Sequence, residues 1–324
     1  PTSSVIGLIA AANTPEPRPS GATCYRETVG PRTLAGGPIN LMSPAPRPCA
    51  LGMSPRCVPH PQTVTPTLSR MTSGPNDETP HMLGFQPEGE FWNRVANEYW
   101  QQKPLAFTFT EEDTPFGRDA VFAALVADVP HDPLDWIQLA TSTTPSNVRD
   151  YRMVSFRRYG PAPADKDFAG YFERLRGVSF GFNVHDLGRR NPSLLATTKV
   201  FSQQLGSVPG TPPVQKWELD VFAGSYPVTP LGIHRDNAGV FSFSIWGKRT
   251  YLLWPPAYFT PGHPDLIRPD RAVIERHAGE ATRIDVAPGR GVYWPPHFWH
   301  VVLADGNPFA VAQVSAYFAQ ADLK

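Results

Sequence analysis

The chain of 324 residues carries 29 basic and 29 acidic side chains, and 41% of its residues are hydrophobic. This length suffices for one large domain or two small ones, and the balanced charge is unlike the basic excess of nucleic-acid-binding proteins. No apolar run approaches the ~20 residues that span a bilayer, and the short run 5–12 lacks the preceding basic residues of a signal peptide. Three cysteines, all between Cys24 and Cys57, cannot form a disulfide framework. We therefore expect a cytoplasmic protein with reduced thiols that binds neither nucleic acid nor membrane.

Residues 1–80 differ in composition from the rest of the chain. They hold 15 of the 38 prolines but only one aromatic residue, Tyr25, and they contain no Lys, Trp or Phe. Such a segment cannot bury enough apolar surface to offset the entropy of ordering its backbone. We predict a disordered, Pro-rich tail before a domain over residues 81–324. A targeting or docking tail, or translated upstream sequence, is the alternative.

Helical patterns dominate the front of the domain, residues 85–215. Apolar residues at 91, 92, 95, 96, 99 and 100 recur with the spacing of one broad helix face, and Pro104 ends the pattern. Residues 105–110 alternate as a strand does. Two further helices are predicted over residues 119–127 and 167–176.

From Lys216 onward the pattern becomes that of β-strands. Residues 217–222 alternate with a period of two, and Gly- and Pro-rich turns separate the further strand candidates, which are 240–245, 250–254, 281–286, 291–294, 299–303 and 309–318. Many short strands at close spacing are typical of an antiparallel sandwich or barrel. We predict a mainly β fold with flanking helices and a β core over residues 216–320.

Two stretches carry residue types that bind metals. In the first, His234 and Asp236 project to one side of a strand, because side chains alternate along it. In the second, the apolar strand after Pro295-Pro296 supplies His300. Two imidazoles and one carboxylate on one face of Fe(II) leave positions open for a co-substrate and O₂. The commoner reading of His-x-Asp alone is a buried histidine bonded to a carboxylate, and His297, in the turn before the strand, is the rival third ligand.

The motifs resemble, in order and spacing, those of the jumonji-C and cupin-like oxygenases. His234-Arg235-Asp236 is followed by a strand and by Gly247-Lys248-Arg249-Thr250-Tyr251, similar to the family's His-x-Asp and Gly-x-[Lys/Arg]-x-aromatic blocks. The Pro-Pro-His-Phe-Trp-His segment at 295–300 resembles the second metal motif, in which the His after the Trp is the ligand. Residues 98–105 resemble the Tyr-Trp-x-x-Lys-Pro-Leu segment of bacterial ribosomal oxygenases. The resemblance covers roughly residues 85–320.

The resemblance implies a double-stranded β-helix (jelly roll) and a reaction that uses Fe(II), 2-oxoglutarate and O₂. His234, Asp236 and His300 match the iron ligands, and Arg249 matches the cation that holds the far carboxylate of 2-oxoglutarate. A guanidinium can grip such a carboxylate in bidentate fashion, whereas Lys248 is expected on the opposite face of its strand. The implied reaction hydroxylates an unactivated C–H of an amino-acid or peptidyl side chain and releases succinate and CO₂.

The sequence also departs from the family. Where relatives often carry a hydroxyl residue three positions before the first His, this chain has Leu231, and we predict that Ser242 or Ser244 supplies the missing hydroxyl to 2-oxoglutarate. The chain ends at Lys324 without a counterpart of the C-terminal winged helix of ribosomal oxygenases. The substrate and dimer architecture of those enzymes is therefore not expected to carry over, and the oligomeric state is left open.

Two other functions stay open: a metal-dependent cupin enzyme that does not use 2-oxoglutarate, and a non-catalytic jumonji-like binding module. The substrate of the oxygenase is an amino acid, a peptide or a protein. Four further histidines lack a partner in their local sequence and are expected in exposed loops, namely His131, His185, His263 and His277. Six aromatic residues are candidates for a dry wall, although most are expected to pack in the core: Trp246, Tyr251, Trp254, Tyr293, Trp294 and Trp299.

Overall fold

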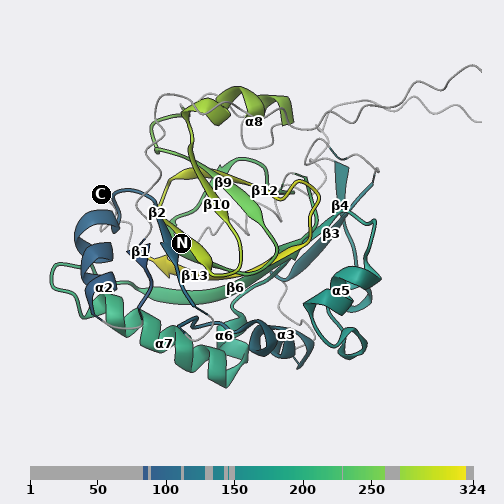
Figure 1. Ribbon diagram of the computed structural model, residues 1–324, viewed down its shortest axis with the longest axis horizontal. Helices are drawn as coiled ribbons and strands as arrows, with labels where there is room; N and C mark the ends of the chain where they lie inside the picture. Colours follow the sequence, from purple (N-terminus) through teal and green to yellow (C-terminus); the bar gives the residue numbers. More distant parts are fainter. Residues whose placement is uncertain are drawn as a thin grey trace, which may run out of the picture. The chain divides into compact units, whose positions relative to one another are not determined.

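The computed structural model describes residues 83–86, 89–110, 113–127, 134–141, 145, 150–227, 229–259 and 271–318. The predicted tail over residues 1–80 lies outside the described residues. Within the described part, strands form two sheets and helices cover their outer faces (Figure 1). No helix in these ranges is long and apolar enough to cross a membrane.

The larger sheet has nine strands. In sheet order they are β1 (Leu83–Gly84), β2 (Leu105–Thr108), β11 (Arg290–Trp294), β8 (Ala238–Trp246), β13 (Phe309–Tyr317), β6 (Lys216–Gly224), β5 (Phe180–Val184), β3 (Trp136–Ala140) and β4 (Tyr151–Met153). Strands β1 and β2 pair in parallel, and the other neighbours pair antiparallel. The sheet is therefore mixed but mostly antiparallel.

The smaller sheet has four strands, all antiparallel. In sheet order they are β10 (Thr282–Val286), β9 (Arg249–Trp254), β12 (Trp299–Leu303) and β7 (His234–Arg235). The chain from β6 to β13 passes repeatedly between the two sheets, with β7, β9, β10 and β12 in the smaller one. This exchange is consistent with a jelly roll.

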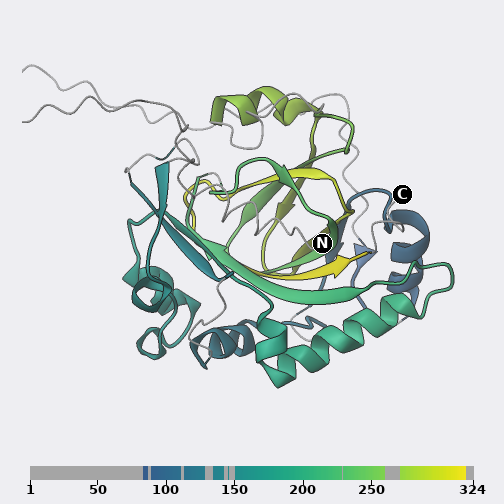
Figure 2. The ribbon, with the colours of Figure 1, turned by 180° about the vertical axis from the view of Figure 1, so that it is seen from behind.

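The helices lie outside the two sheets. They are α2 (Glu90–Arg94) continued by the π-helix η1 (Val95–Tyr99), α3 (Arg118–Ala127), α4 (Phe156–Tyr159), the 3₁₀-helix η3 (Pro163–Asp165), α5 (Phe168–Arg174), α6 (Leu187–Arg190), α7 (Pro192–Gly206), α8 (Arg271–His277) and the 3₁₀-helix η5 (Ala278–Glu280). Figures 1 and 2 show α3, α6 and α7 along the outer face of the larger sheet and α8 over the smaller sheet. The layers are thus helix, small sheet, large sheet and helix.

Alternation along β6, β8 and β13 separates two environments. One face of the larger sheet carries Leu219 on β6, Phe241 and Phe243 on β8 and Val314 on β13, and these side chains join the main core with Phe201 of α7. Buried aromatic and aliphatic side chains of this kind each contribute about 1.5–3 kcal/mol relative to exposure. The other face of the same strands looks toward the smaller sheet and carries most of the polar residues described below.

The turn between β8 and β9 requires glycine. Gly247 has φ +68°, and a Cβ at this position would lie 1.9 Å from the carbonyl oxygen of Pro308. Only glycine accepts both the left-handed backbone and this close approach. The turn therefore fixes where β9 begins, and with it the position of Arg249.

Most predicted elements are confirmed. All seven strands predicted from residue 217 onward are present with ends within two residues, and the helices over 119–127 and 167–176 correspond to α3 and α5. The predicted helix over 91–100 is α-helical only as far as Arg94 and π-helical beyond it. The front segment 85–215 also contains β3, β4 and β5, which the sequence patterns do not predict, and the long helix α7.

Candidate metal centre

The structure brings together the three predicted ligand residues. His234 lies on β7 and His300 on β12, and the two residues are direct partners in the antiparallel ladder. Their ring centroids are 4.1 Å apart, and Asp236 follows directly after β7. One ligand atom from each residue lies within 4.8 Å of the other two.

Hydrogen bonds to the backbone orient both imidazole rings. His234 Nδ1 lies 3.0 Å from the carbonyl oxygen of Gly232, and His300 Nδ1 lies 3.1 Å from that of Phe298. A carbonyl only accepts, so each Nδ1 carries a proton, and in the neutral imidazole, the form that binds a metal, each Nε2 keeps its lone pair. His300 Nε2 is 3.5 Å from Asp236 Oδ2. Two unprotonated Nε2 atoms beside a carboxylate form a donor set that suits a divalent first-row metal.

Burial shapes the charges at this centre. Burial lowers the pKa of His300 well below its usual value, and His234 and Arg249 lower it further. Burial also raises the pKa of Asp236, although His234 lowers it. A neutral His300 is the form that binds metals, and a bound cation would compensate the cost of a buried carboxylate.

The backbone around the centre is held by specific turns. Gly232 has φ +72°, and its N–H donates to the carbonyl oxygen of Thr229 at 3.0 Å, which closes the turn before β7. The N–H of His297 donates to the carbonyl oxygen of Asp236 at 2.7 Å and joins the two metal-binding segments. His297 has φ +63°, and it does not belong to the three-residue cluster. His297, the rival third ligand, therefore contacts Asp236 through its backbone and is not one of the three clustered side chains.

The predicted co-substrate cation is buried without an acidic partner. Arg249 at the start of β9 is 4% exposed, whereas Lys248 beside it is exposed. Among the described residues no carboxylate pairs with Arg249, and its Nε has no hydrogen-bond partner. Burial lowers its pKa to about 9. A buried guanidinium in this state lacks the anion that would offset its desolvation.

Ser242 on β8 lies at the centre of a small polar network around this guanidinium. Its Oγ accepts from Arg249 Nη2 at 2.7 Å and from Gln313 Nε2 at 3.3 Å, and it lies 2.7 Å from Tyr251 Oη. A hydroxyl has two lone pairs and one proton, so Ser242 donates its proton to Tyr251. The O–H of Tyr251 is then left to donate elsewhere. Ser244, the other predicted serine, bonds instead to the carbonyl oxygen of Gly247 at 3.5 Å.

The network and the metal centre share one interior. In the β9–β12 ladder His300 pairs with Leu253, four residues from Arg249, or about 13 Å along the strand. The Arg249 side chain covers part of this distance, because its Cζ lies 4.5 Å from the ring centroid of Tyr251. Arg249 and the triad thus approach one another from opposite ends of β9.

Sequence reasoning missed Gln313. It lies on β13 directly between Asp220 of β6 and Ser242 of β8 in the larger sheet. The available signal was its alternation: Gln313 and Ser315 are polar residues two apart in a strand of Ala and Val. Such a pattern places both on one face.

Of the six aromatic residues predicted as candidates to exclude water from the site, some line the interior between the two sheets and the others pack elsewhere. Trp294 lies 5.0 Å from the ring of His300 and 5.3 Å from that of Tyr251, so these two aromatic residues line the interior. Tyr293 faces away and stacks on Trp100. The other three contact residues outside this interior: Trp246 with Phe172, Trp254 with Phe259, and Trp299 with Phe259.

Two histidines expected in exposed loops have partners, so this expectation is wrong for them. His185 is buried between Glu218 and Asp220 of β6, with nitrogen–oxygen distances of 3.3 and 3.2 Å. Burial lowers its pKa, but the hydrogen bonds and charges of the two carboxylates outweigh that effect and raise the pKa to about 10. His277 on α8 is half-buried and bonds Tyr258 Oη at 3.1 Å. His131 and His263 lie outside the described residues.

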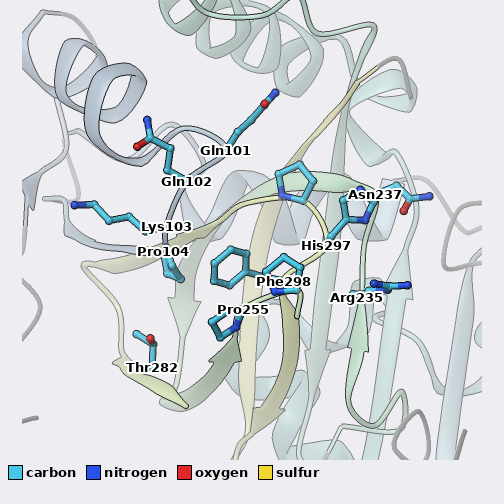
Figure 3. Close-up of a pocket in the computed structure, with 12 residues that line it drawn as sticks. Gln101, Gln102, Lys103, Pro104, Arg235, Asn237, Pro255, Thr282, His297 and Phe298 are labelled. Atoms are coloured by element: carbon cyan, nitrogen blue, oxygen red, sulfur yellow. The ribbon is translucent and has the colours of Figure 1, made fainter. Parts of the chain in front are cut away.

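A pocket of about 730 Å³ is lined by residues that adjoin the triad in sequence (Figure 3). Arg235 and Asn237, which flank Asp236 in sequence, line it, and so does His297 from the turn before β12. Gln101 and Lys103, which follow η1, close the other side. Four prolines, Phe298 and Thr282 are among the remaining lining residues. The pocket therefore touches both segments that carry the triad.

Comparison with known proteins gives a structural likeness only. No family model matches the chain, and no curated protein matches it. Among solved structures the chain is similar to YcfD of Escherichia coli at 16% identity and a TM-score of 0.46, covering 72% of this chain and 54% of that one. A structure of YcfD, a ribosomal oxygenase from Escherichia coli, in complex with cobalt and 2-oxoglutarate is similar at 15% identity and a TM-score of 0.42, covering 73% and 54%. The chain thus spans about half the length of these structures.

Proposed function

We propose that this chain is an Fe(II)- and 2-oxoglutarate-dependent oxygenase that hydroxylates a C–H of an amino-acid or peptidyl side chain. In this proposal residues 81–324 form one catalytic domain, and β6–β13 form a double-stranded β-helix. One observation carries it: the buried cation Arg249, without an acidic partner among the described residues, faces the interior that also contains His234, Asp236 and His300.

His234, Asp236 and His300 are the proposed iron ligands. Their support is the pair of Nε2 lone pairs that the backbone carbonyls direct away from Gly232 and Phe298, together with the neighbouring carboxylate. An Fe(II) ion held there would supply O₂ activation coupled to oxidative decarboxylation of 2-oxoglutarate, which gives succinate and CO₂. Three protein ligands leave positions open for the co-substrate and O₂.

Arg249 is the proposed partner of the far carboxylate of 2-oxoglutarate. Its unsatisfied Nε, its buried charge and the free O–H of Tyr251 form a set of donors for one anion. Ser242 positions both donors, since it accepts from Arg249 and donates to Tyr251. Ser244 has no such contact in the described part of the chain and keeps only the expectation drawn from sequence.

The interior around these groups is apolar. Val240, Leu253, Val292, Trp294 and Val302 form one buried cluster between the two sheets, together with Tyr251. This lining excludes water from the carboxylates and strengthens the ion pair with Arg249. The chain thereby holds and orients the co-substrate, while the open end of the barrel admits the substrate.

The experiment is an anaerobic titration of 2-oxoglutarate into the full chain loaded with Fe(II), followed by the metal-to-ligand absorption band. Succinate release on admission of O₂ provides the second readout. We expect saturable binding and succinate formation. Iron binding without any dependence on 2-oxoglutarate would refute the oxygenase and favour a metal-dependent cupin enzyme, and failure to bind iron would favour a non-catalytic module.

A further inference from the structure

The pocket beside the triad carries positive charge without an acidic lining residue. Figure 3 shows Lys103 on one side and Arg235 with Asn237 on the other. Lys103 and Arg235 are both exposed, and the residues that line the pocket include neither Asp nor Glu. Glu98, an acidic residue whose charge reaches Lys103, forms its own ion pair with Arg94 at 3.1 Å. The pocket therefore attracts an anion.

Arg235 is held in place for such a role. Its Cζ lies 4.9 Å from the ring centroid of Trp299, and the indole N–H of Trp299 donates to the carbonyl oxygen of Pro256 at 3.1 Å. Contact with an anchored indole restricts the motion of the guanidinium. Its N–H groups, which lie in the plane of the guanidinium, stay available to a ligand. No carboxylate among the described residues pairs with Arg235. The side chain is thus pre-organised to bind a carboxylate.

Two residues that line the pocket have an unusual backbone conformation. Gln101 has φ +58°, and both polar atoms of its side-chain amide are buried without a hydrogen-bond partner. His297, on the facing side, also has a left-handed backbone, with φ +63°. Strained backbone and unsatisfied polar groups cluster where ligands bind. The buried amide of Gln101 exposes no surface to a ligand, so Gln101 and His297 contribute their backbone conformation to the pocket wall.

The position of the pocket sets the length of the ligand. Side chains alternate along a strand, so Arg235 projects from the face opposite His234 and Asp236. A group bound by Arg235 and a carbon at the triad therefore lie on opposite sides of β7, so a ligand that reaches both must extend past this strand. A free amino acid is too short to reach both positions.

We propose that this pocket binds an acidic peptide, in which the Asp or Glu side chain on Arg235 belongs to a different residue from the one that is hydroxylated. Lys103, whose ammonium lies 4.8 Å from the ring centroid of Tyr99, adds positive charge at the edge of the pocket. This inference rests on the proposed oxygenase function, because it names the substrate class of the same site. It makes Arg235 a residue that determines specificity, distinct from the residues that hold metal and 2-oxoglutarate.

The test is selection from an unbiased display library of decapeptides on the full chain without O₂, followed by affinity measurement of the enriched peptides. We expect enrichment of Asp or Glu and at least about tenfold weaker binding to Arg235→Gln, because the variant cannot form the charge-assisted hydrogen bond. Lys103→Gln should weaken binding less. Lys248→Gln is the matched control, because Lys248 is exposed at the β8–β9 turn and does not line the pocket.

A charge reversal makes the test specific. In the double variant Arg235→Glu with Lys103→Glu, the same selection should enrich Lys and Arg, a result that mere disruption of the fold cannot produce. Failure to enrich acidic peptides on the unmodified chain, or the same enrichment on Arg235→Gln, would overturn the inference. The anaerobic titration of 2-oxoglutarate tests the oxygenase separately, so a chain that binds 2-oxoglutarate but selects no acidic peptide refutes only this substrate class.

Discussion

Arg249 Nη2 donates to Ser242 Oγ at 2.7 Å and links the two sheets of the barrel. Ser242 belongs to the larger sheet and Arg249 to the smaller one, and the tight turn at Gly247 joins their strands. Because Ser242 also accepts from Gln313, one hydroxyl sets the direction of both the arginine and the tyrosine donors. The proposed carboxylate site is therefore built from four side chains on three strands.

Replacing Arg249 should remove the charge that this site offers. Arg249→Met is expected to weaken 2-oxoglutarate binding by at least about tenfold, because a charge-assisted hydrogen bond contributes about 1.5–3 kcal/mol. Arg249→Lys should recover part of the affinity, since a point charge replaces a planar fork. The anaerobic titration measures both variants. Lys248→Met is the control, and a larger loss in Lys248→Met than in Arg249→Met would move the role to Lys248.

The two serines predicted from sequence should behave differently. Ser242→Ala removes the acceptor of Arg249 and the donor to Tyr251, so it should weaken 2-oxoglutarate binding, and Tyr251→Phe should do the same by removing one donor. Ser244→Ala is the matched control, because its Oγ bonds the turn carbonyl of Gly247. Equal losses for Ser242→Ala and Ser244→Ala, measured in the same titration, would show that the network does not position the co-substrate.

The metal ligands can be tested without turnover. His234→Ala, Asp236→Ala and His300→Ala should each abolish Fe(II) binding, measured by equilibrium dialysis under anaerobic conditions, while the thermal melting of the chain shows that it still folds. His297→Ala should bind iron, since this residue contacts Asp236 through its backbone N–H. Loss of iron in His297→Ala with retention in His300→Ala would reverse the assignment of the third ligand.

Periodicity explains why the β core could be predicted from sequence. Successive side chains of a strand such as β6 point alternately toward the helices and toward the interior between the sheets. Residues 217–222 show this period of two in sequence. The same alternation predicts that His234 and Asp236 share a side. The facing of side chains within one strand can therefore be predicted from sequence without knowledge of the tertiary structure.

Contacts between distant segments could not be predicted in this way. All five residues of β5 are buried, so this strand shows no polar alternation. His185 looks isolated in sequence because its partners Glu218 and Asp220 lie 33 and 35 residues further along the chain. The π-helical turn after Arg94 likewise depends on packing that the apolar spacing alone does not reveal.

The cluster of His185, Glu218 and Asp220 predicts how stability depends on pH. The folded-state pKa of His185 is raised to about 10, so its contribution is complete below its ordinary pKa, about 6.5, and is lost as the pH rises toward 10. Burial raises the pKa of Glu218, but the hydrogen bonds of His185 and Lys216 outweigh it and lower the pKa to about 2. The contribution of Glu218 is thus present above its usual pKa near 4.5 and is lost as the pH falls toward 2. Asp186 acts in the opposite direction on the loss of stability at low pH, because burial and the charges of Glu218 and Asp220 raise its pKa.

Removing the histidine should therefore be more harmful than removing the whole cluster. His185→Phe leaves Asp220 without a cation and Glu218 with Lys216 alone, and it should lower the free energy of unfolding by about 3–5 kcal/mol. His185→Phe with Glu218→Gln and Asp220→Asn should recover much of that loss. Urea unfolding at pH 6 and pH 9 measures both effects. The unmodified chain should lose more stability between these two pH values than the triple variant, since only the former binds a proton at His185 on folding. Equal pH dependence in the two proteins would show that His185 is not protonated in the folded state.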